Sequence, residues 1–284
     1  MPLKTGWLKY LWRERRSVLL RQIIRMAKLY KTPFKNLLRN ILEVVEENNA
    51  GFTLPIVASI ALRRPEIASL ILSFHQEIAS HGNNHVNYRY LSSEAQRTDI
   101  TGSLQVFKEL GVHVRGFRAP YNMYADETPR LLEEFDFLWD GGLGFRPPYS
   151  DYTRFFRVPV NGRRSSYVCI PLCRWSDDRM IDNYGLDNKQ MTRLLKARMK
   201  RAQKNHGVVM FDLHPIRIGQ PKYIGVLKRV LADGKALNGW FPTVTEAVEY
   251  WLRHHEWKDG ASFCCLLTGD IDNCTFFEYL TRLF

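Results

Sequence analysis

No long hydrophobic run occurs in this sequence of 284 residues. The longest apolar stretch covers residues 56 to 62, whereas about 20 apolar residues are needed to cross a bilayer. The stretch is therefore interpreted as a core segment, and no integral membrane segment is predicted. The N-terminal segment is too charged and aromatic for the apolar part of an export signal. We expect a cytoplasmic protein, for which peripheral membrane contact stays open.

Cysteine is scarce and irregularly placed. The five cysteines are Cys169, Cys173, Cys264, Cys265 and Cys274. An odd number at uneven spacing in a long chain excludes a disulfide scaffold. No histidine or second cysteine pair lies near Cys169 and Cys173, so a zinc site there is disfavoured. The sequence predicts reduced core thiols and a reducing compartment.

Acidic residues are outnumbered. The chain has 41 lysines and arginines against 29 aspartates and glutamates, which gives a formal net charge of +12. Nucleic acid, anionic lipid head groups and acidic glycans all suit such a balance. However, the basic clusters at residues 13–16, 63–64 and 196–204 are more typical of solvated helix faces than of binding stripes. Because no nucleic-acid motif accompanies them, nucleic acid is not predicted as a partner.

The chain is long and apolar enough to bury a core, since 45% of its residues are hydrophobic. A single domain is predicted over residues 1–284, because α/β barrels of this length commonly form one core. Apolar residues at helical spacing predict two helices, at residues 7–30 and 32–47, before any strand. We divide the chain into N-terminal helices, a main barrel, and a last strand with a terminal helix, at residues 1–50, 51–255 and 261–284.

Strands and helices then alternate. Strands are predicted at residues 52–58, 77–80, 112–118, 137–140, 156–160, 167–172 and 207–213. Helices are predicted to begin at residues 65, 93, 128, 189, 221 or 223, and 243, the second of them with a capping box from Ser93 to Gln96. This alternation is typical of a mostly parallel sheet with helices outside, either open and doubly wound or closed as a barrel. Both arrangements place an active site at the carboxyl ends of the strands.

Two histidines, His81 and His85, lie four residues apart just after a predicted strand. Four residues make about one helical turn, so both rings can face the same way, and imidazole is a common zinc ligand. Two surface histidines in a polar loop are the alternative, which spacing alone favours because zinc usually needs a third protein ligand. The other polar clusters decide between the two.

Those clusters follow other predicted strands and resemble the motifs of the polysaccharide deacetylases, carbohydrate esterase family 4, whose domain is called the NodB homology domain. The family's motifs H-(S/T)-x-x-H, R-x-P-Y, W-D and L-H-P are similar to His81-Gly-Asn-Asn-His85, Arg118-Ala-Pro-Tyr121, Trp139-Asp140 and Leu213-His214-Pro215. The resemblance covers about residues 37 to 254. It implies an irregular, seven-stranded (β/α) barrel and a hydrolase that acts on N-acylated sugars.

The family's first motif, an acidic T-F-D-D or D-x-D sequence after the first strand, is missing from its usual place, since no aspartate precedes Asp99. A similar sequence, Thr268-Gly-Asp270-Ile-Asp272, follows an apolar segment near the C-terminus. We therefore expect a circularly permuted barrel, with residues 263–267 beside residues 52–58. The alternatives are an ordinary acidic turn and a lost or truncated first motif.

With this resemblance, His81, His85 and Asp272 are predicted to hold a divalent metal ion, most simply zinc. The ion polarises the acyl carbonyl and acidifies a water molecule. Asp270 is expected to take the proton of that water, and Arg118 to pair with Asp270 and keep it ionised. A structural ion pair is the alternative for Arg118.

His214 is expected to protonate the departing amine, with Asp140 orienting or tuning it. The resemblance implies the backbone N–H of Tyr121 as a donor to the oxyanion. The alternatives are a loop-capping role for His214 and a wall or core role for Tyr121.

The predicted function is thus removal of an acetyl or formyl group from an amino sugar or related glycan. A phosphate-bearing or lipid-linked substrate suits the basic balance and the expected cytoplasmic location. Two alternatives remain, an inactive glycan-binding barrel and a basic protein associated with membrane or nucleic acid.

Overall fold

The computed structural model describes residues 23–281. Residues 23–29 are helical, and the earlier part of the helix predicted at residues 7–30 lies outside the described residues. Helix α2 (Phe34–Glu47) confirms the second predicted helix, and its side chains Leu37 and Ile41 are completely buried. The helix ends before Asn49, whose positive φ of 48° prevents a further helical turn.

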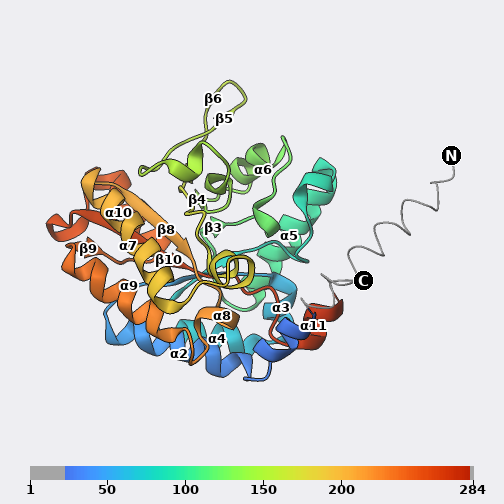
Figure 1. The fold of residues 1–284 in the computed structure, drawn as a ribbon. Coiled ribbons are helices and arrows are strands. Elements are labelled where there is room, and N and C mark those ends of the chain that lie inside the picture. The colour runs from blue at the N-terminus through green and yellow to red at the C-terminus, as the bar shows by residue number, and fades with distance from the viewer. Residues whose placement is uncertain (1–22, 282–284) are drawn as a thin grey trace, which may run out of the picture.

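One parallel sheet forms the centre of the molecule (Figure 1). Its continuous path has the order β7-β4-β3-β2-β1-β10-β8, and β9 pairs with β10. The strands are β1 (Thr53–Ile56), β2 (Glu77–Ser80), β3 (Gly116–Phe117), β4 (Trp139–Asp140), β7 (Val168–Cys169), β8 (Val208–Asp212), β9 (Gly239–Trp240) and β10 (Phe263–Thr268). The last strand therefore lies between β1 and β8, and the predicted parallel pairing of the last and first strands is confirmed.

The sheet curls until its two ends meet. A parallel bridge joins Leu172, just beyond β7, to Met210 of β8, and the N–H of Cys173 donates to the carbonyl of Met210 at 2.9 Å. This contact selects the irregular barrel over the open, doubly wound sheet. The strand predicted at residues 156–160 is not one of the parallel strands. Phe156 forms an isolated antiparallel bridge to Cys169 of β7. β5 (Pro159–Val160) and β6 (Arg163–Arg164) form a separate antiparallel hairpin, whose Asn161-Gly162 turn has positive φ at both residues.

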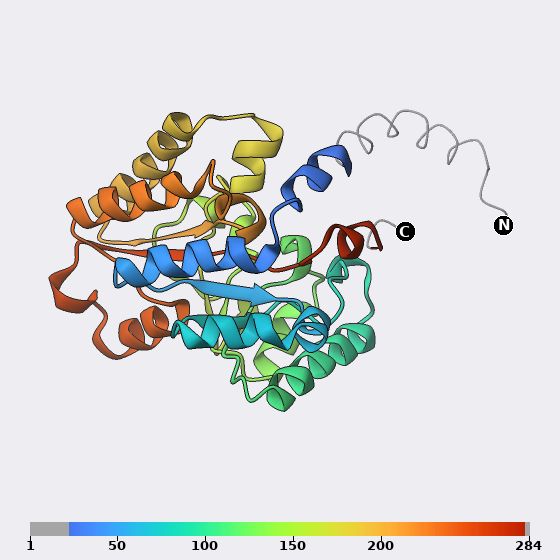
Figure 2. The ribbon, with the colours of Figure 1, turned by 90° about the horizontal axis from the view of Figure 1, so that it is seen from below.

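Helices surround the sheet (Figures 1 and 2), with α7, α9, α2 and α4 packed in succession on one side. They are α3 (Ala58–Arg63), α4 (Pro65–Ser73), α5 (Ser93–Glu109), α6 (Thr128–Glu134), α7 (Asn188–Lys204), α8 (Pro215–Ile218), α9 (Ile224–Ala236), α10 (Val244–His254) and α11 (Phe276–Thr281). The short helices α3 and α8 were not predicted.

The capping box predicted from Ser93 to Gln96 is wrong by one residue. The cap of α5 is Ser92, whose hydroxyl accepts from the N–H of Ala95 at 3.2 Å. The side chain of Gln96 instead donates to the carbonyl of Leu91 and accepts from Thr128. Tertiary contacts with α6 therefore replace the local cap.

The main core lies between the sheet and the helices. Strand β10 shows why, because all six of its residues are buried and its side chains alternate between two hydrophobic clusters. Cys265 and Leu267 face the cluster that includes α2, whereas Cys264 and Leu266 join Trp139 and Met210. A strand buried on both faces must be apolar throughout, as this one is.

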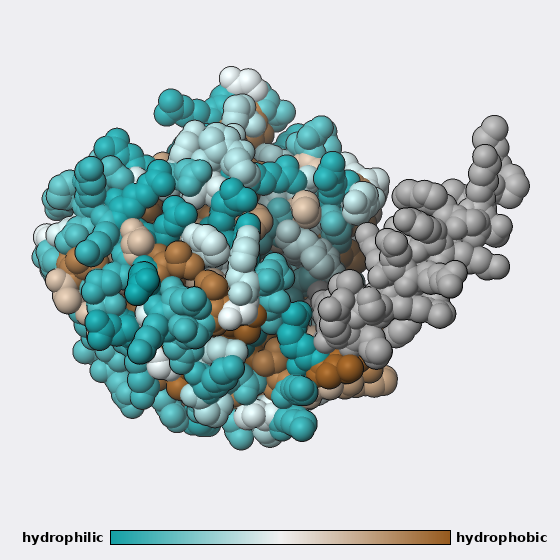
Figure 3. Space-filling view, viewed as in Figure 1, coloured by the Kyte–Doolittle hydropathy of each residue, from teal (hydrophilic) through white to brown (hydrophobic). Residues whose placement is uncertain are grey.

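Much of the outer surface seen in Figure 3 is hydrophilic. Among the described residues, no helix has the length and apolar character to cross a membrane.

Candidate active site

Polar side chains gather at the carboxyl ends of five strands. His81 follows β2, Arg118 follows β3, and Asp270 and Asp272 follow β10. Asp212 ends β8, His214 comes two residues later, and Asp140 ends β4. Because all these strands are parallel, their ends meet at one edge of the barrel, as predicted.

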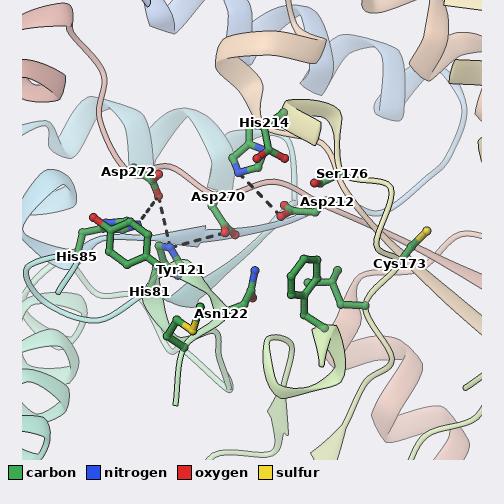
Figure 4. Close-up of a pocket in the computed structure, with 14 residues that line it drawn as sticks. His81, His85, Tyr121, Asn122, Cys173, Ser176, Asp212, His214, Asp270 and Asp272 are labelled. Atoms are coloured by element: carbon green, nitrogen blue, oxygen red, sulfur yellow. Dashed lines mark ion pairs between the residues drawn. The ribbon is translucent and has the colours of Figure 1, made fainter. Parts of the chain in front are cut away.

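His81, His85 and Asp272 lie close together in the arrangement predicted for a metal site (Figure 4). The Oδ1 atom of Asp272 is 3.4 Å from Nε2 of His81 and 3.2 Å from Nε2 of His85. The other ring nitrogen of His81, Nδ1, is 2.7 Å from the carbonyl oxygen of Arg118. A carbonyl can only accept a hydrogen bond, so Nδ1 carries the hydrogen and Nε2 presents its lone pair to the site.

A loop, not a helical turn, brings the two histidines together. His85 has a φ of 40° and Gly82 a φ of 73°, so the segment between them is not helical. The carboxylate of Asp99 holds this loop by accepting from the N–H groups of Asn83 and Asn84 and from the hydroxyl of Tyr88. A Cβ on Gly82 would lie 2.7 Å from Oδ2 of Asp99, so the loop in this conformation requires glycine at this position.

Arg118 is completely buried and binds two carboxylates. Its Nη1 donates to Oδ1 of Asp270 at 2.7 Å, the pairing predicted from the sequence, and to Oδ1 of Asp212 at 3.1 Å. Its Nη2 donates to Thr268, the residue that ends β10. Burial lowers the pKa of Arg118, but the carboxylates of Asp270 and Asp212 raise it further than burial lowers it. The guanidinium therefore remains charged.

The partner of His214 is Asp177, not Asp140. Nδ1 of His214 is 2.7 Å from Oδ1 of Asp177, whose side chain is fully buried. Burial lowers the pKa of His214, and the neighbouring carboxylates of Asp212, Asp177 and Asp178 outweigh it and raise the pKa well above its usual value. The imidazole is thus held in the protonated form that a general acid requires. The acidic pair at residues 177–178, just after a predicted strand, was the sequence signal that could have indicated this partner.

Asp140 stabilises a loop on the barrel rim instead. Its carboxylate accepts from the hydroxyl of Tyr124 and from the N–H groups of Leu143, at 2.9 Å, and Gly142, at 3.4 Å. Burial raises the pKa of Asp140 to about 6, although these hydrogen bonds oppose the shift. The sequence predicted that Asp140 contacts His214. Its carboxylate instead accepts hydrogen bonds from Tyr124, Leu143 and Gly142.

Tyr121 lies at the rim with its side chain 52% exposed. Its φ of 60° is in the left-handed region, and the edge of its ring packs against His85 with 4.5 Å between centroids. The ring therefore contributes to the wall beside the proposed metal ligands. The role of its backbone N–H as an oxyanion donor stays a prediction.

A cavity of about 400 Å³ connects these groups. The polar residues of its lining include His81, His85, Asp212, His214, Asp270 and Asp272 (Figure 4). Its apolar lining includes Met123, Phe145 and Leu172. No lysine or arginine is present among the described residues that line it. The excess of positive charge therefore lies elsewhere on the molecule, and the described lining of the cavity offers no lysine or arginine to a phosphate group.

Residues 30–138 match the model of the polysaccharide deacetylase family. This segment is therefore similar to the polysaccharide deacetylases. The matched polysaccharide deacetylase segment contains His81, His85, Arg118 and Tyr121 and ends just before Asp140. The family recognition made from the motifs is thereby confirmed, and the remaining polar groups of the site come from the chain after this segment.

Solved structures share the fold of this chain. One described as a polysaccharide deacetylase from Mycobacterium smegmatis has a TM-score of 0.68 and 24% identity and covers 78% of each chain. A second structure, described as a polysaccharide deacetylase from Pseudomonas aeruginosa PAO1, has a TM-score of 0.69 and 20% identity and covers 82% of this chain and 77% of the other. The structure of Puue allantoinase has a TM-score of 0.71 and 22% identity, and it covers 83% of this chain and 78% of the other. No curated protein sequence matches the chain.

Proposed function

We propose that this protein is a metal-dependent hydrolase that removes an acetyl or formyl group from the nitrogen of an amino sugar or related glycan. One observation carries the proposal. Three side chains that could hold a metal ion, a carboxylate paired with a buried arginine, and a histidine paired with a buried aspartate all lie at one cavity. Together these are the parts that metal-assisted amide hydrolysis requires.

The residues fit a divalent ion. The donor atoms of His81, His85 and Asp272 lie within 4.8 Å of one another, and two imidazoles with one carboxylate are a common zinc donor set. A bound ion would polarise the acyl carbonyl and lower the pKa of a water molecule. The three protein ligands leave a coordination position for substrate, as catalytic zinc sites do.

Asp270 and His214 would transfer the protons of the reaction. Asp270 is held by Arg118 at 2.7 Å and would take a proton from the attacking water. His214, which Asp177 orients through Nδ1, would give the proton on Nε2 to the departing amine. The N–H of Tyr121 would stabilise the oxyanion.

We also infer that the barrel is circularly permuted relative to the family's usual order. The parallel placement of β10 beside β1 supports this inference, because the carboxylates that follow β10 stand where a missing first motif is needed. The substrate within this proposal is a cytoplasmic amino sugar, and phosphate-bearing and lipid-linked forms are included. Their phosphate or lipid group would lie outside the cavity, because no lysine or arginine is among the described residues that line it.

The experiment uses the full chain loaded with zinc. Metal content is measured by mass spectrometry, and release of acetate or formate is measured on N-acetyl and N-formyl amino sugars. We expect about one ion per chain and loss of the ion in His81→Ala and His85→Ala, because zinc is held poorly by two ligands. Asp270→Asn should keep the metal but lose roughly a hundredfold or more in turnover.

His113→Ala is the matched control, because His113 is exposed and does not line the cavity. Full metal retention in both ligand variants would contradict the metal site. Glycan binding by the zinc-loaded protein without any acyl release would favour the inactive binding barrel instead.

A further inference from the structure

Asp212 is a buried carboxylate at the active site that the proposed chemistry does not yet use. It ends β8 and follows four buried apolar residues, and its own side chain is 6% exposed. Its position in the sheet is opposite Thr268 of β10, so it reaches the rim from the strand next to the one that carries Asp270. A carboxylate buried this deeply requires specific partners.

Its two oxygens contact two different parts of the site. Oδ1 lies 3.1 Å from Nη1 of Arg118, the same nitrogen that binds Asp270 at 2.7 Å. Oδ2 lies 3.9 Å from Nε2 of His214, as the dashed line in Figure 4 shows. Asp212 therefore contacts both the Arg118–Asp270 pair, which contains the proposed general base, and His214, the proposed general acid.

His214 lies between two carboxylates as a result. Asp177 holds Nδ1 at 2.7 Å, and Asp212 faces Nε2, the nitrogen that must reach the departing amine. A separation of 3.9 Å is too long for a hydrogen bond, so Asp212 attracts the imidazolium without occupying the N–H. That leaves the Nε2 hydrogen available to a substrate.

Other charged groups lie around this imidazole and its carboxylate partners. Asp178 comes from the same loop as Asp177, Asp270 from the end of β10, and Arg217 from α8. The charge of Arg217, which is half-buried and paired with Asp182, acts to lower the pKa of both Asp177 and Asp178. Burial and the neighbouring charge of Asp270 raise the pKa of Asp212 to about 7, although His214 and Arg118 oppose this shift. Above that pH, Asp212 is the anion that faces Nε2, opposite Asp177 on Nδ1.

We propose that Asp212 is a positioning residue that keeps the proton on Nε2 of His214 until the amine departs. The inference rests on the proposed function. When the C–N bond breaks, its electron pair goes to nitrogen, which takes the Nε2 proton. His214 is then neutral and regains a proton from solvent. The attacking water leaves its hydroxyl on the acyl carbon, and the other hydrogen of that water goes to Asp270 as a proton.

The test is Asp212→Asn in the zinc-loaded full chain, since asparagine keeps the shape and the acceptor oxygen but removes the charge. We expect kcat on an N-acetyl amino sugar to fall about tenfold, with KM and metal content unchanged. The alkaline limb of the kcat profile should move down by about one pH unit, because the imidazolium loses an anionic neighbour. An aryl acetate, whose phenolate leaves without a proton, should show little loss.

Equal losses on the amide and the aryl ester, or an unmoved alkaline limb, would overturn the inference while leaving the proposed function intact. If the wild type cleaves no amide, the proposed function fails, and NMR titration of His214 still decides the role of Asp212. An unchanged His214 pKa in the variant would then refute it. Asp212→Ser, which is smaller, is the second variant if the asparagine variant does not fold.

Discussion

At the scale of single residues, the partner of the acid histidine shows how a buried carboxylate is assigned. Asp140 and Asp177 are both fully buried; Asp140 ends the strand predicted at residues 137–140, and Asp177 lies after the strand predicted at residues 167–172. Only Asp177 reaches His214, because Asp140 is occupied by Tyr124 and two loop N–H groups. A carboxylate that binds Nδ1 fixes the tautomer and orientation of an imidazole. The assignment of Asp177 as the partner of His214 can be tested by comparing asparagine variants of Asp177 and Asp140.

We expect Asp177→Asn to lower kcat by roughly tenfold to a hundredfold, because His214 loses both its orientation and an anionic neighbour. Asp140→Asn is the matched variant and should change kcat much less, since it does not touch the imidazole. Steady-state kinetics on an N-acetyl amino sugar, with thermal unfolding measured alongside, checks the comparison. A larger loss of kcat in Asp140→Asn, without unfolding, would restore the assignment made from the sequence.

At the scale of elements, β10 is the strand on which the site depends. It pairs with β1, β8 and β9, it is completely buried, and the residues that follow it carry Asp270 and Asp272. The described ends of the chain also meet, because Tyr30 packs against Phe276 with 6.4 Å between ring centroids. The place of β10 in space, not its place in the chain, should therefore determine whether the site forms.

A rearranged chain tests this point. It begins at residue 260, continues to residue 284, and is joined by a flexible linker to residue 1, so that it ends at residue 259. The new ends fall in an exposed turn, where such cuts are tolerated. We expect the rearranged protein to fold, to bind one zinc ion and to retain activity within about tenfold. A chain that simply stops at residue 260 is the comparison and should not fold, because it lacks a central strand.

A folded, metal-binding chain without residues 261–284 would contradict the role of β10. Loss of folding in the rearranged protein would mean that the existing chain order is itself required.

At the scale of the whole molecule, positive charge and the active site are separated. Helix α7 contains seven lysines and arginines and no acidic residue among its 17 positions, and it packs on α9 at the outside of the barrel. The cavity, by contrast, is lined by four aspartates and three histidines. The net charge of the protein therefore does not indicate the charge of the substrate group that enters the cavity. The clustered carboxylates favour a bound cation there.

Because of that cluster, zinc should stabilise the whole fold. Zinc at a hundred times its Kd adds about 2.7 kcal/mol to the free energy of unfolding, which raises Tm by several degrees in a chain of this size. Removing the metal with a chelator should lower Tm by the same amount. Asp272→Ala should abolish most of the shift, whereas His113→Ala should retain it. Equal shifts in the wild type and Asp272→Ala, measured by calorimetry, would place the ion elsewhere.

The sequence by itself determined the alternation of strands and helices, the apolar strand β10 and the residues at the strand ends. These follow from local patterns: spacing of apolar residues, helix-starting prolines and motifs of a few residues. His81, His85 and Arg118 could be named because each lies within such a motif. Their approach to one edge followed from the rule that parallel strands end together.

Only the tertiary structure decided which buried charges pair. His214 and Asp177 are 37 residues apart, and Arg118 and Asp212 are 94 apart, so no local pattern relates them. The bridge from Leu172 to Met210 that closes the barrel and the loop that turns His85 toward Asp272 are equally non-local. Contacts of this kind depend on how the whole sheet curls and which donor lies nearest a buried carboxylate, and the closed barrel settles both.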